Sequence, residues 1–130
     1  MNKAALISIV DDDSVVRGAI ESLVKSYGFL ACTFASANAF LQSGLGAETS
    51  CLISDVQMPD IDGVELQDRL ADLGLSIPTI FITAYPDDDV RTRVLSAGAV
   101  CFLHKPFDPQ SLIRCINDAL NKQTKKITPA

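Results

Sequence analysis

Short apolar runs alternate along this chain with longer segments whose apolar residues recur every three or four positions. We expect strands in the apolar runs, at residues 5–10, 30–34, 51–54, 79–83 and 100–103. We expect helices in the periodic segments, at residues 14–27, 37–45, 63–73, 87–97 and 110–120. Strands that alternate with helices predict an α/β domain with a mostly parallel sheet, helices on both faces and right-handed crossovers.

The length of 130 residues is that of one average domain, which can bury a core without disulfides or a structural metal. We expect a domain at residues 1–121, followed by a flexible tail or the start of a linker at 122–130. A formal net charge of -5 argues against attraction of the whole surface to nucleic acid or to an anionic membrane. No apolar run approaches the roughly 18 residues of a membrane span, and no signal-peptide pattern is visible.

The cysteines predict no chemistry of their own. Cys32, Cys51, Cys101 and Cys115 contain no CxxC pair and have no histidine at metal-ligand spacing. Three of them lie within apolar runs, where a thiol acts as a small apolar side chain. We therefore expect free thiols and a reducing, cytoplasmic environment.

Polar residues follow the expected strands at the points where the strands end. Asp11 and Asp12 come after the first strand, Asp55 after the third, Thr83 at the end of the fourth and Lys105 after the fifth. Ligands of open parallel sheets bind beyond the carboxyl ends of the strands, where loops from distant segments converge. We expect these side chains to meet at one edge of the sheet.

Carboxylates gathered there would repel one another, by on the order of 4 kcal/mol for a pair about 4 Å apart. A raised pKa or a bound cation would relieve this repulsion, and an all-oxygen set of ligands favours Mg²⁺. A metal held by few carboxylates keeps positions open for water or phosphate, which suits phosphoryl chemistry. Asp55 would then be free to act as a nucleophile, with Thr83 and Lys105 as partners for phosphoryl oxygens.

Four motifs together resemble the receiver domains of bacterial two-component response regulators. They are VDDD at residues 10–13, SDVQMPDIDGVEL at 54–66, FITA at 81–84 and AGAVCFLHKPF at 97–107. The resemblance covers roughly residues 7–120 and is most similar to nitrogen-fixation and nitrate-response regulators, which carry a helix-turn-helix output domain. It implies a flavodoxin-like (βα)5 fold, a doubly wound five-stranded parallel sheet with strand order 2-1-3-4-5.

The resemblance also assigns roles to the strand-end residues. It implies that Asp55 accepts a phosphoryl group from a sensor histidine kinase or a phosphotransfer protein, and that Thr83 and Lys105 bind the phosphoryl oxygens. It implies a Mg²⁺ site formed by Asp11, Asp12, Asp55 and the backbone carbonyl of Gln57. A receiver of this kind is a signalling switch that catalyses its own phosphoryl transfer and dephosphorylation, and not a metabolic enzyme.

The switch itself is implied by further positions. Thr83 and Phe102 would move together, the hydroxyl toward the phosphoryl group and the ring inward. The surface of the fourth helix, fifth strand and fifth helix would change with them and control an output domain or partner, and this surface would also serve a homodimer. Gln57, Ala84 and Tyr85 would shape access to the phosphoryl site. The peptide bond between Lys105 and Pro106 is typically cis in such domains.

Two other functions fit parts of the sequence. DDDSV at residues 11–15 matches the DxDxV loop of haloacid-dehalogenase-type phosphohydrolases, in which Asp11 would attack and Asp13 would be the acid and base, but this leaves SDVQMPD without a purpose. A flavodoxin-like nucleotide-binding module would need a phosphate-binding loop rich in Ser, Thr or Gly after the first strand, and none follows it.

A second run of three aspartates lies at residues 87–89, ahead of a helix and not behind a strand. Carboxylates at the first turn of a helix cap its free N–H groups and meet the positive end of its dipole. We expect residues 87–89 and Asp13 to have this structural role. His104, the single histidine, is expected to be an exposed side chain.

Overall fold

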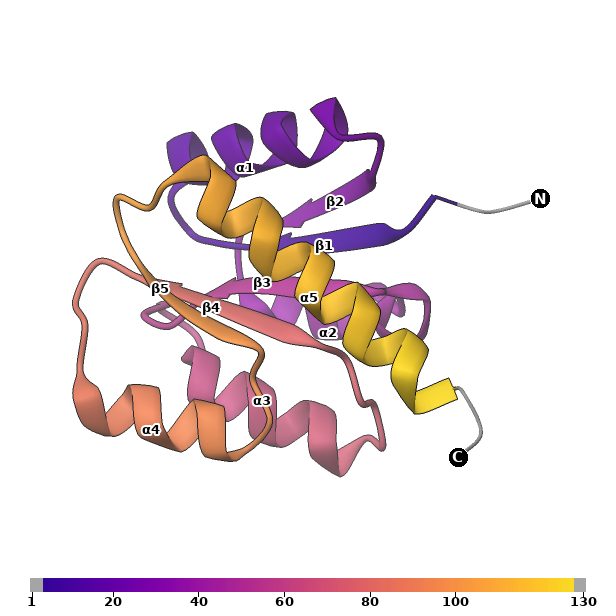
Figure 1. The fold of residues 1–130 in the computed structure, drawn as a ribbon. Helices are drawn as coiled ribbons and strands as arrows, with labels where there is room; N and C mark the ends of the chain where they lie inside the picture. The colour runs from indigo at the N-terminus through magenta and orange to yellow at the C-terminus, as the bar shows by residue number, and fades with distance from the viewer. Residues whose placement is uncertain (1–3, 128–130) are drawn as a thin grey trace.

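The computed structural model describes residues 4–127, with side chains described up to residue 121. The strands are β1 (Leu6–Val10), β2 (Leu30–Phe34), β3 (Cys51–Asp55), β4 (Thr79–Thr83) and β5 (Cys101–His104). The helices are α1 (Ser14–Ser26), α2 (Ala37–Ser43), α3 (Gly63–Asp72), α4 (Asp88–Ser96) and α5 (Pro109–Ile127), with a short 3-10 helix η1 (Gly46–Glu48). Figure 1 shows how these elements alternate along the chain.

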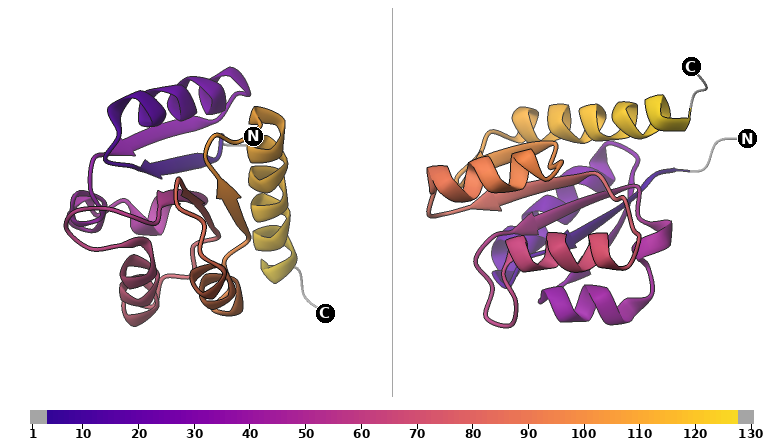
Figure 2. Two further views of the ribbon diagram at one scale, coloured as in Figure 1. Left: turned by 90° about the vertical axis from the view of Figure 1, so that its left-hand side faces the viewer. Right: turned by 90° about the horizontal axis from the view of Figure 1, so that it is seen from below.

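The five strands form a single parallel sheet in the order β2-β1-β3-β4-β5, which confirms the expected topology. Helices α1 and α5 cover one face of the sheet and α2, α3 and α4 cover the other (Figures 1 and 2). The chain therefore winds in both directions from β1, as a doubly wound sheet does.

The core lies on both faces of the sheet, and it explains why the strands could be predicted. All residues of β3 and β4 are buried, so these strands have nearly continuous apolar sequences instead of alternating ones. On one face Ile9 and Ile53 pack with residues of α1 and α5. On the other face Phe40 and Leu66 are fully buried between the sheet and helices α2 and α3.

The helix starts follow the capping pattern. Asp13 is the N-cap of α1, and its carboxylate accepts hydrogen bonds from the N–H groups of Val15 and Val16. Asp87 is the N-cap of α4, and the two aspartates after it lie in the first turn. Both structural assignments are confirmed, and Asp62 caps α3 in the same way by accepting from the Glu65 N–H.

Two helix ends differ from the expectation. Helix α2 ends at Ser43 because Gly44 adopts a left-handed conformation with φ of 74°, and η1 follows. Helix α5 continues to Ile127, beyond the expected end at residue 120. Residues 121–127 contain no Gly or Pro and are rich in Lys and Gln, which are good helix formers, so nothing in the sequence ends the helix earlier. Of the expected tail, residues 128–130 lie outside the described residues.

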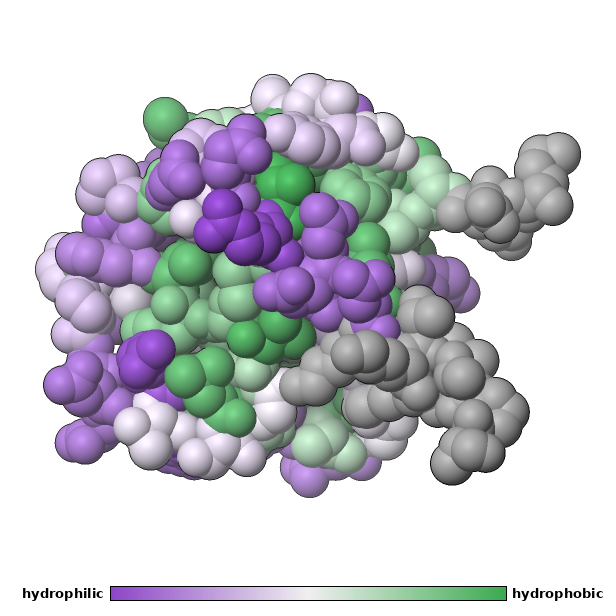
Figure 3. All heavy atoms as spheres, in the orientation of Figure 1, coloured by the Kyte–Doolittle hydropathy of each residue, from purple (hydrophilic) through white to green (hydrophobic). Residues whose placement is uncertain are grey.

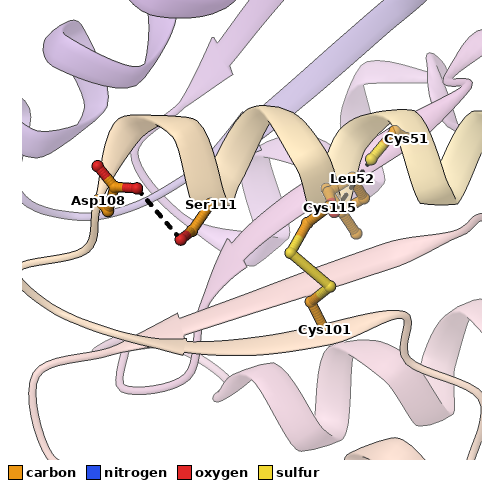
Figure 4. Close-up of a disulfide and its surroundings, with 6 residues drawn as sticks. All are labelled: Cys51, Leu52, Cys101, Asp108, Ser111 and Cys115. Atoms are coloured by element: carbon orange, nitrogen blue, oxygen red, sulfur yellow. Dashed lines mark hydrogen bonds between the residues drawn. A yellow bond between two sulfur atoms is a disulfide. The ribbon is translucent and has the colours of Figure 1, made fainter.

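The cysteines correct another expectation. Cys101 on β5 and Cys115 on α5 are joined in a disulfide, with Cα atoms 6.2 Å apart, so these two are not free thiols (Figure 4). Spacing along the chain did not indicate this pair, because the partners come together only when α5 packs on β5. Cys32 and Cys51 are free, as expected, and burial raises the pKa of the Cys51 thiol to about 12. In the described part of the chain, no helix has the length and apolar character needed to cross a membrane.

Substitution by alanine at two helical glycines should have opposite effects on the stability of the fold. A Cβ at Gly63 would lie 2.9 Å from the Asp55 carbonyl oxygen and 2.8 Å from the ring of Phe81, which is fully buried. A Cβ at Gly18, exposed in α1, would meet nothing within 4 Å. We expect Gly63→Ala to destabilise the fold by about 1 to 3 kcal/mol through overpacking. We expect Gly18→Ala to stabilise it by about 0.5 to 1 kcal/mol.

Urea unfolding followed by circular dichroism measures both changes against the wild type. Because the two substitutions are chemically identical and both lie in helices, Gly18→Ala is the matched control for Gly63→Ala. A Gly63→Ala protein as stable as the wild type would show that α3 does not pack as closely on β3 and β4 as described.

Candidate functional site

Four strands bring polar side chains to one end of the sheet. Asp11 directly follows β1, Asp55 is the last residue of β3, Thr83 is the last residue of β4 and Lys105 directly follows β5. The parallel register places the ends of neighbouring strands side by side. The structure therefore brings together residues that are far apart in the sequence.

Lys105 lies between two buried carboxylates. Its Nζ is 3.0 Å from Oδ2 of Asp11 and 3.0 Å from Oδ2 of Asp55. Asp11 is fully buried and Asp55 is 5% exposed, so both charges are largely removed from water. The Lys105–Pro106 peptide bond is cis, as the sequence resemblance implied. One ammonium group facing two buried carboxylates leaves the site short of positive charge.

The pKa values of the site reflect this imbalance. Burial raises the pKa of Asp55 above its ordinary value of 3.8, and the charge of Asp11 raises it further, against the lowering effect of the Lys105 ammonium. Burial opposes the charge of Lys105, but its contacts with Asp11 and Asp55 outweigh burial and raise the pKa of Lys105 above 10.5. Lys105 is therefore charged at neutral pH, and the stability from its ion pairs is lost only as the pH rises through this raised pKa.

The acidic residues can hold a metal ion. Asp11, Asp12 and Asp55 each offer a carboxylate oxygen within 4.8 Å of the others. The buried Oδ2 of Asp11 has no hydrogen-bond partner with good geometry, although it lies in ionic contact with Lys105. An incompletely satisfied buried carboxylate next to an all-oxygen cluster fits a hard divalent cation such as Mg²⁺. Asp12 is exposed, so an ion would reach this cluster from the solvent side.

Two contacts that sequence reasoning did not find hold Asp11 in place. The N–H of Asp13 donates to Oδ1 of Asp11 at 2.9 Å, and the guanidinium of Arg17 donates to the Asp11 backbone carbonyl at 2.6 Å. Arg17 lies in the first half of α1 and reaches back to the end of β1. Its position one helical turn beyond the Asp13 cap was the only available signal.

Gln57 makes a second unforeseen contact. Its side-chain carbonyl accepts a hydrogen bond from the Thr83 hydroxyl at 2.7 Å, and its backbone N–H donates to Oδ1 of Asp55 at 3.3 Å. The Thr83 hydroxyl also accepts from the N–H of Tyr85 at 3.0 Å. The Gln57 side chain and the Tyr85 backbone therefore hold the Thr83 hydroxyl, while the Gln57 backbone contacts the Asp55 carboxylate.

The remaining predicted residues lie around this centre. Ala84 and Tyr85 directly follow β4, at the end of the sheet where Asp55 lies, and both are exposed. Phe102 on β5 is half-buried against the apolar cluster between the sheet, α3 and α4. His104 is exposed at the end of β5, as expected. The Asp13 carboxylate accepts hydrogen bonds from backbone N–H groups at the start of α1.

Comparison with known proteins shows the family to which this chain belongs. The response regulator receiver domain family matches residues 7–117. The chain belongs to this family. Receiver domains are signalling modules of two-component systems, they interact with sensor histidine kinases, and they bind Mg²⁺ at an acidic cluster of the kind found in this chain.

Curated proteins that resemble this receiver domain include bacterial response regulators. The response regulator protein TmoT of Ectopseudomonas mendocina is 41% identical over 119 residues, which are 92% of this chain and 54% of TmoT. Nodulation protein W of Bradyrhizobium diazoefficiens is 38% identical over 122 residues, 94% of this chain and 54% of that protein. The chain thus spans about half the length of the curated relatives it matches.

Solved structures agree with the fold of this receiver domain. The response regulator StyR superposes with a TM-score of 0.88 at 36% identity, over 95% of this chain and 63% of that one. The structure described as FixJ-N superposes with a TM-score of 0.83 at 35% identity, over 92% of this chain and 96% of that one. The flavodoxin-like fold and the membership of the response regulator family are both confirmed.

Proposed function

We propose that this receiver domain is a phosphorylation switch in which Asp55 accepts a phosphoryl group from the phosphohistidine of a sensor kinase or phosphotransfer protein. The placement of Asp55 carries the proposal: it lies at the end of a central strand, next to a carboxylate pair suited to Mg²⁺, and it contacts the ammonium of Lys105 at 3.0 Å. Family membership supports the same role.

The transfer is a displacement at phosphorus. A carboxylate oxygen of Asp55 attacks, the P–N bond to the histidine breaks, and the imidazole nitrogen keeps the electron pair. Lys105 stays charged beside the acceptor and binds a phosphoryl oxygen. Mg²⁺ held by Asp11, Asp12, Asp55 and the Gln57 carbonyl would neutralise the charge that develops on the phosphoryl group. The product is an acyl phosphate on Asp55.

The response begins with Thr83. To bind a phosphoryl oxygen, its hydroxyl must exchange the side chain of Gln57 for the phosphate. This movement leaves space beside Phe102, whose ring is half-buried between the sheet and helices α3 and α4. Inward rotation of that ring would change the surface formed by α4, β5 and α5, and Figure 3 shows apolar surface between α4 and α5 in the region of β5. An apolar surface of this kind suits an output domain or a second copy of the domain.

The proposed function also implies where the domain acts and which residues control the lifetime of the phosphorylated state. In this proposal the domain acts in the cytoplasm, where a kinase phosphorylates it and it then controls an output domain or partner. Its net charge of -5 argues against DNA binding by this domain, so DNA binding would belong to another domain. Ala84 and Tyr85 are exposed, and together with Gln57 they would control the access of water to the acyl phosphate and so its lifetime. The proposal includes a domain at 1–121 followed by a flexible tail or the start of a linker at 122–130.

The phosphohydrolase alternative has less support. It requires Asp13 as acid and base, but the Asp13 carboxylate accepts two backbone N–H groups of α1. It also requires Asp11 as nucleophile, and Asp11 is fully buried, whereas Asp55 is 5% exposed.

Incubation with phosphoramidate, a small donor with a P–N bond, tests the proposal. With Mg²⁺ present, intact-protein mass spectrometry should show the mass of one added phosphoryl group, and mild alkali should remove it because acyl phosphates are labile. A protein that never gains this mass, at any donor concentration that labels another receiver domain, would refute the proposed function.

The Gln57 side chain makes a prediction for the resting state. Gln57→Ala removes the nearer of two acceptors of the Thr83 hydroxyl, at 2.7 Å, and leaves the Tyr85 carbonyl at 3.2 Å. One such hydrogen bond is worth about 0.5 to 1.5 kcal/mol. We therefore expect beryllofluoride, a mimic of the phosphoryl group, to bind this variant with Mg²⁺ about two- to tenfold more tightly than the wild type. Calorimetric titration measures the affinity. Gln67→Ala, the same change at a glutamine whose side chain donates to the Val94 carbonyl, is the control. Equal affinity of wild type and Gln57→Ala would contradict the prediction.

A further inference from the structure

The disulfide between Cys101 and Cys115 joins the two elements that border the proposed switch surface. Cys101 begins β5 and directly precedes Phe102, and Cys115 lies in the middle of α5 (Figure 4). The loop that the disulfide closes contains Lys105. The bond thus ties the strand that carries the switch ring to the helix that packs over it.

The two residues are placed so that the bond forms without rearrangement of the backbone. Their Cα atoms are 6.2 Å apart, within the range of disulfides, and Figure 4 shows the two side chains directed toward each other from the strand and the helix. Cys115 is 7% exposed, whereas Cys101 is half-buried and accessible from the edge of the sheet. The folded domain therefore brings the two thiols close enough to form the disulfide.

The other two cysteines are not placed to compete with Cys101 and Cys115 for disulfide formation. Cys51 is fully buried in β3, and the pKa of its thiol is raised to about 12, so it is present as an unreactive thiol. Cys32 is half-buried on β2, at the opposite edge of the sheet from β5. Oxidation of the folded chain should therefore join Cys101 to Cys115 and leave Cys32 and Cys51 as thiols.

We propose that Cys101 and Cys115 form a reversible thiol–disulfide modification site, and that the disulfide restrains the movement of β5 against α5. Within the described residues β5 pairs only with β4, so it is an edge strand that backbone hydrogen bonds hold on one side. The disulfide adds a covalent link from β5 to α5. The regulatory half of the proposal rests on the proposed function, whereas the redox site itself does not.

The oxidation is a thiol–disulfide exchange with a low-molecular-weight disulfide. The thiolate of Cys101, the more accessible of the two, attacks one sulfur of the oxidant and releases one molecule of thiol. The thiolate of Cys115 then attacks the Cys101 sulfur of the mixed disulfide and releases the second thiol. Two protein thiols lose two electrons and two protons, and one disulfide molecule becomes two thiol molecules.

The redox site is tested by equilibrating the whole chain in glutathione buffers that range from reduced to oxidised, followed by acid quenching and alkylation of the unfolded protein. Intact mass should show four alkylated cysteines at the reduced end and two at the oxidised end, and peptide mapping should place the disulfide between 101 and 115. The Cys32→Ser protein should lose one alkylation at both ends. Four alkylated cysteines at the oxidised end, or a disulfide mapped to Cys32 or Cys51, would overturn the proposal.

The restraint is tested by hydrogen exchange of β5 and α4 with and without beryllofluoride and Mg²⁺. We expect the oxidised wild type to lose most of the change in exchange that the reduced wild type shows, and Cys101→Ser to respond like the reduced wild type in both buffers. Equal responses of the oxidised and reduced wild type would overturn the restraint. A protein in which neither form responds would count against the proposed function, while the alkylation count still decides the redox site.

Discussion

Replacement of Asp55 by asparagine should abolish phosphoryl labelling by phosphoramidate. The asparagine side chain keeps the size and most of the packing of the aspartate but has no carboxylate oxygen to form an acyl phosphate. We expect no added phosphoryl group by intact mass under conditions that label the wild type to high occupancy. Labelling of Asp55→Asn to the same extent as the wild type would place the acceptor elsewhere.

The same variant should remain folded, which separates loss of chemistry from loss of structure. Burial raises the pKa of Asp55, so the folded state holds its proton more tightly than the unfolded chain does. An acid with a raised pKa costs stability once the pH is above that pKa, and the cost disappears as the pH falls toward 3.8. Asp55→Asn should therefore be more stable than the wild type at pH 7 without metal, and this advantage should shrink at acidic pH. Thermal unfolding at a series of pH values measures the difference.

Removal of Mg²⁺ should slow labelling of the wild type by at least about a hundredfold. A divalent cation stabilises the developing charge in phosphoryl transfer by several kcal/mol, and each 1.4 kcal/mol is about a tenfold change in rate. Lys105 cannot replace the ion because it already faces both Asp11 and Asp55. The rate of labelling, measured by intact mass with excess EDTA or with saturating Mg²⁺, checks this result, and equal rates would contradict it.

Two neighbouring aspartates give a matched pair of variants for the metal site. Asp12 is exposed and offers an oxygen to the acidic cluster, whereas Asp13 caps α1. Asp12→Asn should weaken the rise in melting temperature that Mg²⁺ produces and raise the Mg²⁺ concentration needed for labelling. Asp13→Asn should change neither, since asparagine is as good an N-cap as aspartate. A large effect of Asp13→Asn on labelling would revive the phosphohydrolase alternative.

The helices and strands were predictable because their determinants are local, whereas the strand order was implied by the family resemblance. The apolar runs that became β3 and β4 are buried along their whole length, and the capping residues Asp13, Asp62 and Asp87 each act within three residues of their own position. The helix ends were less predictable, because the end of α2 depends on the conformation of one glycine and that of α5 on the absence of a strong stop signal.

The candidate site was predictable in its members but not in its contacts. Parallel topology alone brings Asp11, Asp55 and Lys105 to one edge, so the alternation of strands and helices was sufficient to group them. The hydrogen bond from Thr83 to Gln57 joins residues 26 positions apart, and the disulfide joins residues 14 positions apart. Such contacts depend on side-chain directions after packing, and no spacing rule describes them.

The two runs of three aspartates show the difference between composition and position. Residues 11–13 follow a strand, so Asp11 and Asp12 enter the site and only Asp13 caps a helix. Residues 87–89 precede a helix without following a strand directly, and all three lie at the start of α4. The two runs have the same sequence but different roles, because one follows a strand and the other precedes a helix.

The most direct test is to locate the phosphoryl group after labelling with phosphoramidate and Mg²⁺. Reduction of the acyl phosphate with borohydride, proteolysis and peptide sequencing by mass spectrometry would identify the modified side chain. We expect the modification at Asp55 alone. A modification at Asp11, or at any residue other than Asp55, would contradict the account of this site.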